Sequence, residues 1–285
     1  MDNLIHGLTI GSIIAFVAFG YALIYSILRF INFAHGEIIM VGAYICYFLY
    51  HTLGISSFFL SCFFAMLITG MVGVGLEKIA FKPLRNRSRL SMLLSSLAVS
   101  LILQSLASLI FGTSPRILTD FDPTITVLSK TFYVREIVVM IVLPFLAIAF
   151  FLSLKYTQIG LAIRAIASNQ ARAAHIGIPI NTIISISFFI ASSLACLAGI
   201  ALGMEGGLTP SMGFKYSIWA FAVSVIAGLG SMKGVLIGGL LYGILLNYAI
   251  AYGSGLFADA LSLVAVALIL LIRGKGFFQI KLREF

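Results

Sequence analysis

The sequence holds few side chains that could do chemistry, and their densest group is Asn32, His35 and Glu37. The group borders a long apolar run, and an ionisable side chain at membrane depth is costly enough to suggest a function. Two interpretations stay open. Asn32 and His35 could bridge a bend in the chain while Glu37 caps a helix N-terminus, where negative charge is favoured, or all three could line a translocation pathway. Asn247, inside another apolar run, is a further candidate for such a pathway.

The other patterns point away from catalysis. The four histidines show no metal-ligand spacing, and the GxSxG, HExxH and P-loop patterns do not occur. The three cysteines lie in apolar runs without CxxC spacing, which predicts no disulfide framework. We therefore expect no catalytic residue, no metal site and no cofactor bound by this chain.

Long apolar runs must position these residues. Hydrophobic residues make up 61% of the 285 and charged residues 9%, whereas a soluble domain carries about 25% charged residues. A helix needs about 20 apolar residues to cross a membrane. Eight runs are clear candidates, at 4–28, 38–53, 55–76, 90–111, 137–154, 180–204, 235–252 and 256–272, and a short ninth lies at 217–229. We predict an all-α, polytopic membrane protein with 8–9 transmembrane helices in one domain, 1–285.

Basic residues give this predicted bundle an orientation. If the clusters at 77–89, 155–172 and 273–283 share one side and nine spans alternate, 14 of the 18 Lys and Arg residues fall on that side. The positive-inside rule then places the N-terminus outside and the C-terminus in the cytoplasm. The net charge of +9 is thus an orientation signal and implies no nucleic-acid partner. With eight spans, 217–229 would be re-entrant and the basic tail would lie outside.

Glycine is frequent, with 27 residues, and predicts close packing of helices in lipid. The densest stretch carries Gly228, Gly230, Gly234, Gly238, Gly239 and Gly243. Packing within one chain, a subunit interface and a pore wall all remain open for this stretch.

The segment 155–179 predicts two short helices on the cytoplasmic face. Good helix formers are followed by Gly177 as a stop and Pro179 beyond it. Asn169 can cap a second helix at 170–176, and Gly160 could act as a hinge. An ordinary amphipathic interfacial helix is the alternative.

Several of these features together resemble one family. Arg164-Ala165, Asn169, Ala173 and Gly177-Ile178 resemble the coupling loop of ABC importer permeases. Three further stretches resemble branched-chain amino acid permeases of the LivH type: Gly7-Leu8-Thr9-Ile10-Gly11-Ser12, Ile31 to Glu37, and Gly228 to Gly239. The similarity runs from Gly7 to Phe278.

The resemblance implies a permease subunit in the bacterial cytoplasmic (inner) membrane. Its partners would be a second homologous permease, two cytoplasmic ATPase subunits that carry ATP and Mg, and a periplasmic or lipid-anchored solute-binding protein. The coupling loop within 155–179 would contact an ATPase through Gly160, Arg164, Asn169, Arg172, Ala173 and Gly177.

The solute and the class of transporter are less tightly defined by the resemblance. It implies a branched-chain or related hydrophobic amino acid, while urea or a short amide stays open, as does a homo- or heterodimeric permease. A secondary transporter or channel without an ATPase is the alternative from another class.

Overall fold

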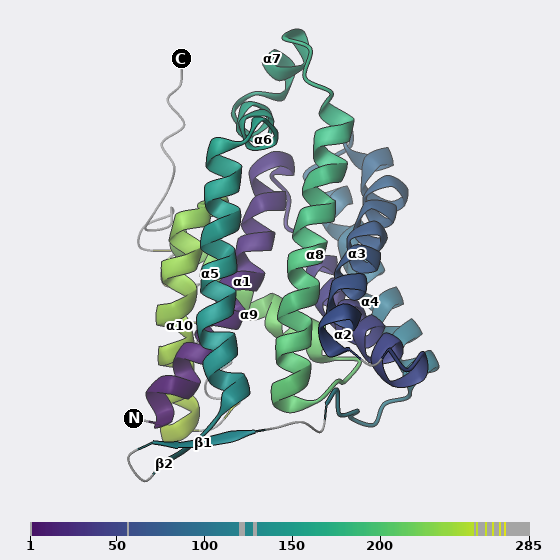
Figure 1. The fold of residues 1–285 in the computed structure, drawn as a ribbon. Coiled ribbons are helices and arrows are strands. Elements are labelled where there is room, and N and C mark those ends of the chain that lie inside the picture. Colours follow the sequence, from purple (N-terminus) through teal and green to yellow (C-terminus); the bar gives the residue numbers. More distant parts are fainter. Residues whose placement is uncertain are drawn as a thin grey trace.

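The computed structural model describes residues 2–253, apart from 56, 120–122 and 128–129, and five isolated positions between 255 and 271. This part of the chain forms a helical bundle with a small hairpin at one end (Figure 1). Its helices are α1 (Asp2–Leu28), α2 (Ala34–Tyr47), α3 (Phe58–Leu76), α4 (Arg89–Phe111), α5 (Val134–Tyr156), α6 (Gln158–Ser168), α7 (Gln170–His175), α8 (Ile180–Gly206), α9 (Met212–Ala227) and α10 (Met232–Tyr252). Short π-helical turns, Phe48–Thr52 and Glu77–Phe81, extend α2 and α3.

Two ends of the bundle can be told apart. Helices α6 and α7 lie at one end, called here the α6–α7 face, and the hairpin and the N-terminus lie at the other, the hairpin face (Figure 1). Arg85 donates a hydrogen bond to Asn181 at the start of α8, which places the α3–α4 link at the α6–α7 face. Arg116 and Leu208 pair at the ends of α4 and α8, on the hairpin face. Helices α1, α3 and α5 therefore run from the hairpin face to the α6–α7 face, and α4, α8 and α10 run the opposite way.

Six helices in the described residues are long and apolar enough to cross a membrane: α1, α3, α4, α5, α8 and α10. The predicted spans 38–53 and 217–229 correspond to α2 and α9, which have only 14 and 16 residues. The predicted span 256–272 lies outside the continuously described residues. The structure thus confirms an all-α polytopic bundle, and the number of 8–9 spans stays a prediction.

Helices α2 and α9 are short because they begin inside the bundle. Ser100 lies 11 residues from each end of α4, or about 16 Å at 1.5 Å per residue. Its hydroxyl donates a 3.1 Å hydrogen bond to Glu37 in the first turn of α2. Gly213, in the first turn of α9, lies so close to Gly36 that an added Cβ would stand 2.5 Å from the Gly36 carbonyl oxygen. Both helices therefore start near the mid-depth of α4.

Burial separates inner from outer helices. The most apolar stretch of α1 is 89% buried and that of α8 is 72% buried, against 28%, 17% and 22% for α3, α4 and α5. The central pair α1 and α8 thus forms the core, while the outer helices expose apolar side chains, as expected of surfaces that face lipid or another subunit. Ten of the fourteen Lys and Arg residues up to position 253 belong to helix ends or links on the α6–α7 face.

A short hairpin connects α4 to α5 in the otherwise helical bundle. Strand β1 (Thr124–Val127) pairs antiparallel with β2 (Lys130–Tyr133), with Thr124 opposite Tyr133. These strands are rich in Thr, Ile, Val and aromatic residues, which favour extended backbone. The apolar runs of the sequence do not predict these strands.

Glycines bring α1 and α10 into backbone contact. A Cβ on Gly243 would collide with the backbone of Gly11, and a Cβ on Gly239 would collide with Ala15. Gly238 instead faces Ala227 of α9 at an ordinary 3.5 Å. Of the other predicted packing glycines, Gly234 lies buried in the first turn of α10, and Gly228 and Gly230 lie in the α9–α10 turn. These contacts are all within one chain.

We predict that Gly243→Ala destabilises the protein by about 1–3 kcal/mol, because the methyl group overpacks a rigid backbone contact. Gly75→Ala is the matched control, since Gly75 also lies in a helix but has no atom within 4 Å of an added Cβ. Thermal unfolding in detergent should show a lower midpoint for Gly243→Ala only. Equal midpoints for both variants would contradict the proposed α1–α10 contact.

Candidate functional site

Polar side chains gather where α2 begins. Asn32, His35 and Glu37 are 1%, 0% and 0% exposed, and Tyr21 of α1 and Ser217 of α9 are buried beside them. We call these five residues the polar core. The first three members are near neighbours in the sequence and could be grouped from it. Tyr21 and Ser217 come from other helices, and no sequence pattern linked them to this group.

Most of the polar core lacks hydrogen bonds. The side chains of Asn32 and His35 and the hydroxyls of Tyr21 and Ser217 make none of good geometry. The His35 ring instead packs edge-on against Tyr21, with 5.8 Å between ring centroids. The bend before α2 is closed by backbone, since the N–H of His35 donates to the Asn32 carbonyl at 3.2 Å. The side chains of Asn32 and His35 thus do not form the predicted bridge across the bend.

Unpaired buried groups of this kind cost about 1–3 kcal/mol each. A structural role would satisfy them within the protein, as Ser96 does when it accepts a 3.2 Å hydrogen bond from the N–H of Phe33. Asn32, whose amide oxygen and nitrogen both lack a partner in the protein, and the second oxygen of Glu37 could bond to water or to a solute.

Glu37 is the charged member of the polar core. One carboxylate oxygen accepts the hydrogen bond from Ser100, and the other makes no hydrogen bond. The second oxygen lies against Gly213, 2.7 Å from where its Cβ would be. The N-terminal turns of α2 and α9 therefore both lie at this carboxylate, and helix N-termini favour negative charge.

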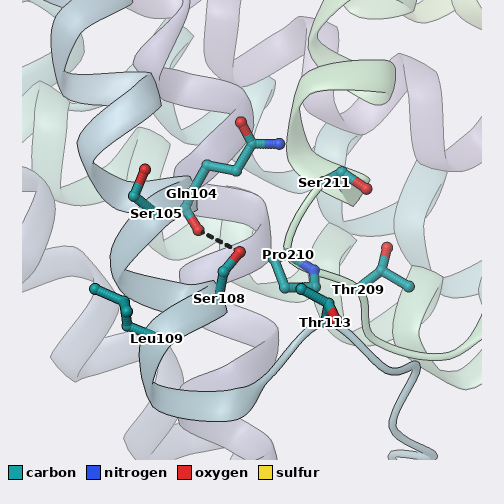
Figure 2. A pocket seen from close by; sticks show the side chains of 8 residues that line it. All are labelled: Gln104, Ser105, Ser108, Leu109, Thr113, Thr209, Pro210 and Ser211. Atoms are coloured by element: carbon teal, nitrogen blue, oxygen red, sulfur yellow. Dashed lines mark hydrogen bonds between the residues drawn. The ribbon is translucent and has the colours of Figure 1, made fainter.

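Two adjoining hollows lie on the hairpin side of the polar core. They measure about 600 and 410 Å³ and share Gln104, Thr209 and Ser211 in their walls. Gln104 lies one helical turn beyond Ser100, which donates its hydrogen bond to Glu37, so the hollows begin about one turn of α4 away from that contact. Figure 2 shows α4 on one side and the segment leading to α9 on the other. Their volumes are in the range of small-molecule sites.

Asn247 lies apart from the polar core. Its side-chain N–H donates a 2.5 Å hydrogen bond to the carbonyl of Asn3, the second residue of α1. This contact fastens the hairpin-face ends of α1 and α10 together. Asn247 therefore joins two helices and lies away from the other predicted pathway residues.

The segment 155–179 forms two short helices, α6 and α7, as its sequence predicts. The Asn169 side chain caps α7 by accepting a 2.9 Å hydrogen bond from the N–H of Arg172. Gly177 ends the segment with φ of +83°, a conformation that favours glycine. Gly160 and Arg164 both meet the Leu154 carbonyl at the end of α5. The glycine at 160 thus permits close packing of α6 on α5, and its role as a hinge stays a prediction.

Most of this segment is open to a partner. Arg164 and Arg172 are exposed, whereas Ala173 is buried. We call residues 155–179 the coupling segment from here on.

Arg29 connects the coupling segment to the polar core, and the sequence did not predict this connection. Its guanidinium donates a 3.0 Å hydrogen bond to the carbonyl of Ala167 in α6. Its φ is +52°, a left-handed value that is uncommon for residues other than glycine. Phe30 follows and packs on Phe81, with 5.3 Å between ring centroids. Asn32 is only three residues beyond Arg29, so a short stretch of chain joins this contact with α6 to the polar core.

A buried ion pair at the α6–α7 face joins the end of α3 to α8. Glu77, fully buried, pairs with Arg85 and accepts a 2.7 Å hydrogen bond from Ser185 of α8. Arg85 also donates to Asn181 at 2.7 Å. Burial lowers the pKa of Arg85, and the nearby Glu77 charge opposes that effect.

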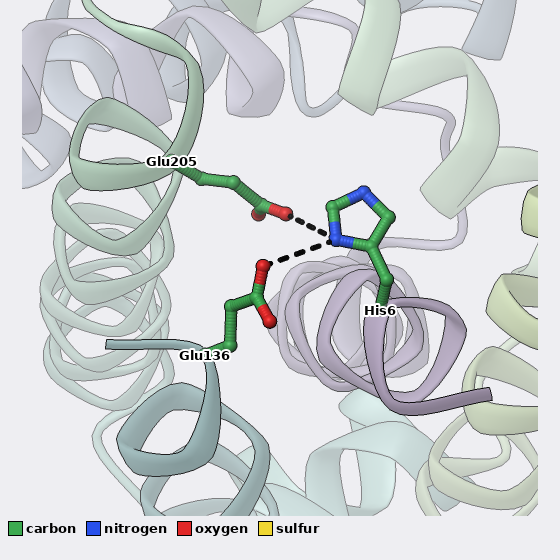
Figure 3. A group of neighbouring side chains, drawn as sticks. All are labelled: His6, Glu136 and Glu205. Atoms are coloured by element: carbon green, nitrogen blue, oxygen red, sulfur yellow. Dashed lines mark ion pairs between the residues drawn. The ribbon is translucent and has the colours of Figure 1, made fainter. Parts of the chain in front are cut away.

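A third group lies at the hairpin face, where His6, Glu136 and Glu205 meet from α1, α5 and α8 (Figure 3). The Nδ1 atom of His6 is 3.4 Å from a Glu136 oxygen and 3.3 Å from a Glu205 oxygen. The three residues are far apart in the sequence, so no ligand spacing could have revealed them.

The fold has helices of membrane length, two shorter helices that meet at a buried carboxylate, and paired short helices on one face. Together these features define a polytopic membrane permease. Comparison with known proteins gives the family. Residues 3–273 match the family model described as branched-chain amino acid transport system / permease component, and the chain belongs to this family.

Relatives cover nearly the whole chain. The high-affinity branched-chain amino acid transport system permease protein LivH of Escherichia coli is 32% identical, over 97% of this chain and 94% of its own. BraD of Pseudomonas aeruginosa, named as the same kind of permease, is 32% identical over 95% and 92%. PsaBC from Streptococcus pneumoniae, solved in complex with Fab, shares the fold, with a TM-score of 0.53, 14% identity and coverage of 98% and 94%. The predicted resemblance to the LivH type is confirmed.

We predict that Glu77→Gln or Arg85→Ala alone destabilises the protein by about 3–5 kcal/mol, since each leaves the other side chain buried without its counter-charge. Replacing both residues should cost less than the sum of the two single changes. Thermal unfolding of the four proteins in one detergent measures this difference. Additive losses would show that the two side chains do not act as a pair.

Proposed function

We propose that this chain is the transmembrane permease subunit of an ATP-driven ABC importer for branched-chain or related hydrophobic amino acids. A second permease subunit would complete the pore. Two separate ATPase subunits would carry ATP and Mg, and a solute-binding protein would deliver the solute. The observation that carries this proposal is the polar core at mid-depth beside an open hollow, in a chain whose relatives are named as branched-chain amino acid permeases.

The solute pathway in this proposal runs from the hollows to the polar core. A zwitterionic amino acid carries one positive and one negative group, and this region offers a partner for each. The free oxygen of Glu37 can accept from an ammonium group. The first turn of α9, which lies at the same place, suits a carboxylate, as the N-termini of broken helices do in transporters.

The coupling segment would receive force from an ATPase. Its exposed residues on the α6–α7 face include Arg164, Arg172 and Gly177, and Gly160, Asn169 and Ala173 shape its two helices. A displacement of α6 would pull on Arg29 through the Ala167 carbonyl and shift the link that carries Asn32. This would switch the polar core between inward and outward access.

The excess of basic residues supports a cytoplasmic location for the α6–α7 face in the bacterial inner membrane. With α10 ending at the hairpin face, a crossing by 256–272 would return the C-terminus to the cytoplasm. That arrangement has nine crossings when α2 and α9 each count as one. A re-entrant α9 is the eight-span alternative.

Two alternatives remain to be tested. Urea or a short amide would use the neutral amides of Gln104 and Asn32 rather than charge. A secondary transporter or channel would need no ATPase. Copurification of this chain with an ATPase encoded beside it would therefore favour the ABC importer over that class.

We predict that Gly177→Asp uncouples ATP hydrolysis from uptake, because aspartate at φ of +83° distorts the end of the coupling segment. Gly54→Asp is the matched control, as Gly54 also has positive φ, at +65°, but lies at the hairpin-face end of α2. Uptake and ATPase activity are measured on the reconstituted complex. Normal uptake by Gly177→Asp would contradict the role given to this segment.

For the solute, we predict that vesicles holding the complete complex take up radiolabelled leucine and not urea. Glu37→Gln should lower leucine uptake about tenfold or more, because a charged hydrogen bond of about 1.5–3 kcal/mol is lost. Ser224→Ala, which removes a hydroxyl bonded only within α9, should leave uptake unchanged. Urea uptake that survives Glu37→Gln would favour the amide alternative instead.

A further inference from the structure

The His6, Glu136 and Glu205 group has the geometry of a metal site. The two separations from His6 Nδ1, 3.4 and 3.3 Å, exceed the 2.7–2.9 Å that is usual for charge-assisted hydrogen bonds. Ligand atoms at the corners of a tetrahedron around zinc, with bonds of about 2.0–2.1 Å, stand about 3.3 Å apart. All three ligand atoms lie within 4.8 Å of one another.

We propose that His6 Nδ1, Glu136 Oε1 and Glu205 Oε1 bind a divalent transition-metal ion of the zinc type at the hairpin face. Three protein ligands leave a fourth position for water, as in other zinc sites with histidine and carboxylate ligands. The ion would join the ends of α1, α5 and α8.

The hydrogen bonds available to these three side chains favour a bound metal ion over a contact of His6 with the two carboxylates alone. Nδ1 of an imidazole carries at most one proton, yet two carboxylates approach that one atom (Figure 3). The Glu205 oxygen is buried and makes no hydrogen bond. A metal ion would satisfy the nitrogen and both oxygens together.

The surroundings hold the ligands and leave an entrance. The hydroxyl of Thr9, one turn from His6, donates to the Glu136 backbone carbonyl at 3.3 Å, which fixes α1 against α5. The side chain of His6 is 42% exposed, against 15% for Glu136 and 18% for Glu205, so an ion can enter past the imidazole.

Arg135 is the cationic neighbour of the group. Its guanidinium lies over the Tyr133 ring, 4.5 Å from the centroid, and acts electrostatically on Glu205. It offsets one of the two carboxylate charges. The proposed ion would balance the remaining negative charge.

The test uses the full-length protein, purified in lipid nanodiscs through a tag without histidine and stripped with a chelator. Zn²⁺ is titrated by calorimetry, and Co²⁺ is titrated by visible absorption, which reports tetrahedral coordination. We expect one ion per chain and a higher unfolding temperature with Zn²⁺. His6→Gln, Glu136→Gln and Glu205→Gln should each weaken binding by about tenfold or more.

His51→Gln is the matched control, because His51 lies on the same face but contacts the Leu118 carbonyl at 2.8 Å. It should bind Zn²⁺ as the unchanged protein does. The proposal is overturned if the unchanged protein does not bind Zn²⁺ at one ion per chain. It is also overturned if His6→Gln or Glu205→Gln binds Zn²⁺ as tightly as the unchanged protein does. Either result would leave the three residues as an ion pair only. Unfolding of the metal-free variants shows whether each is folded, and the wild-type Co²⁺ spectrum tests the site without any variant. These results do not depend on transport.

Discussion

The structure depends on one constraint, the placement of a carboxylate at the centre of a lipid-spanning bundle. Glu37 is fully buried and meets Ser100 at the midpoint of α4. Lipid offers it no hydrogen bonds, and an exposed carboxylate there would cost several kcal/mol. Two helices therefore begin at Glu37 and turn their N-termini toward it, and Gly36 and Gly213 let them approach. Their short length follows from this arrangement.

The ends of the bundle are organised around that centre. At the α6–α7 face, Arg29 joins α6 to the link that carries Asn32, and its left-handed backbone is held by this hydrogen bond and by the buried ring of Phe30. Glu77 and Arg85 fasten α3 to α8 nearby. At the hairpin face, His6, Glu136 and Glu205 gather three helix ends. The link from Arg29 to Asn32 thus joins α6 to the centre of the bundle.

Local patterns predicted much of this. Apolar runs gave the long helices, and capping residues gave α6 and α7 with the Asn169 cap and the Gly177 stop. The polar core was visible because Asn32, His35 and Glu37 are near neighbours in the chain. Tertiary contacts were not predictable from one sequence: Ser100 and Ser217 are ordinary helix serines until the fold brings Ser100 to Glu37 and Ser217 to Gly36. The hairpin was missed because strands this short carry little periodicity.

If the polar core lies on the solute pathway, it must open to water during transport, and cysteine labelling detects such opening. Asn32→Cys is introduced after Cys46, Cys62 and Cys196 are replaced, and the reconstituted complex is treated with a membrane-impermeant thiol reagent with and without trapped ATP. We expect the side of the membrane from which the reagent labels position 32 to change with nucleotide. We also expect leucine to slow the labelling. A cysteine at position 32 that stays unlabelled from both sides in every state would contradict this placement on the solute pathway.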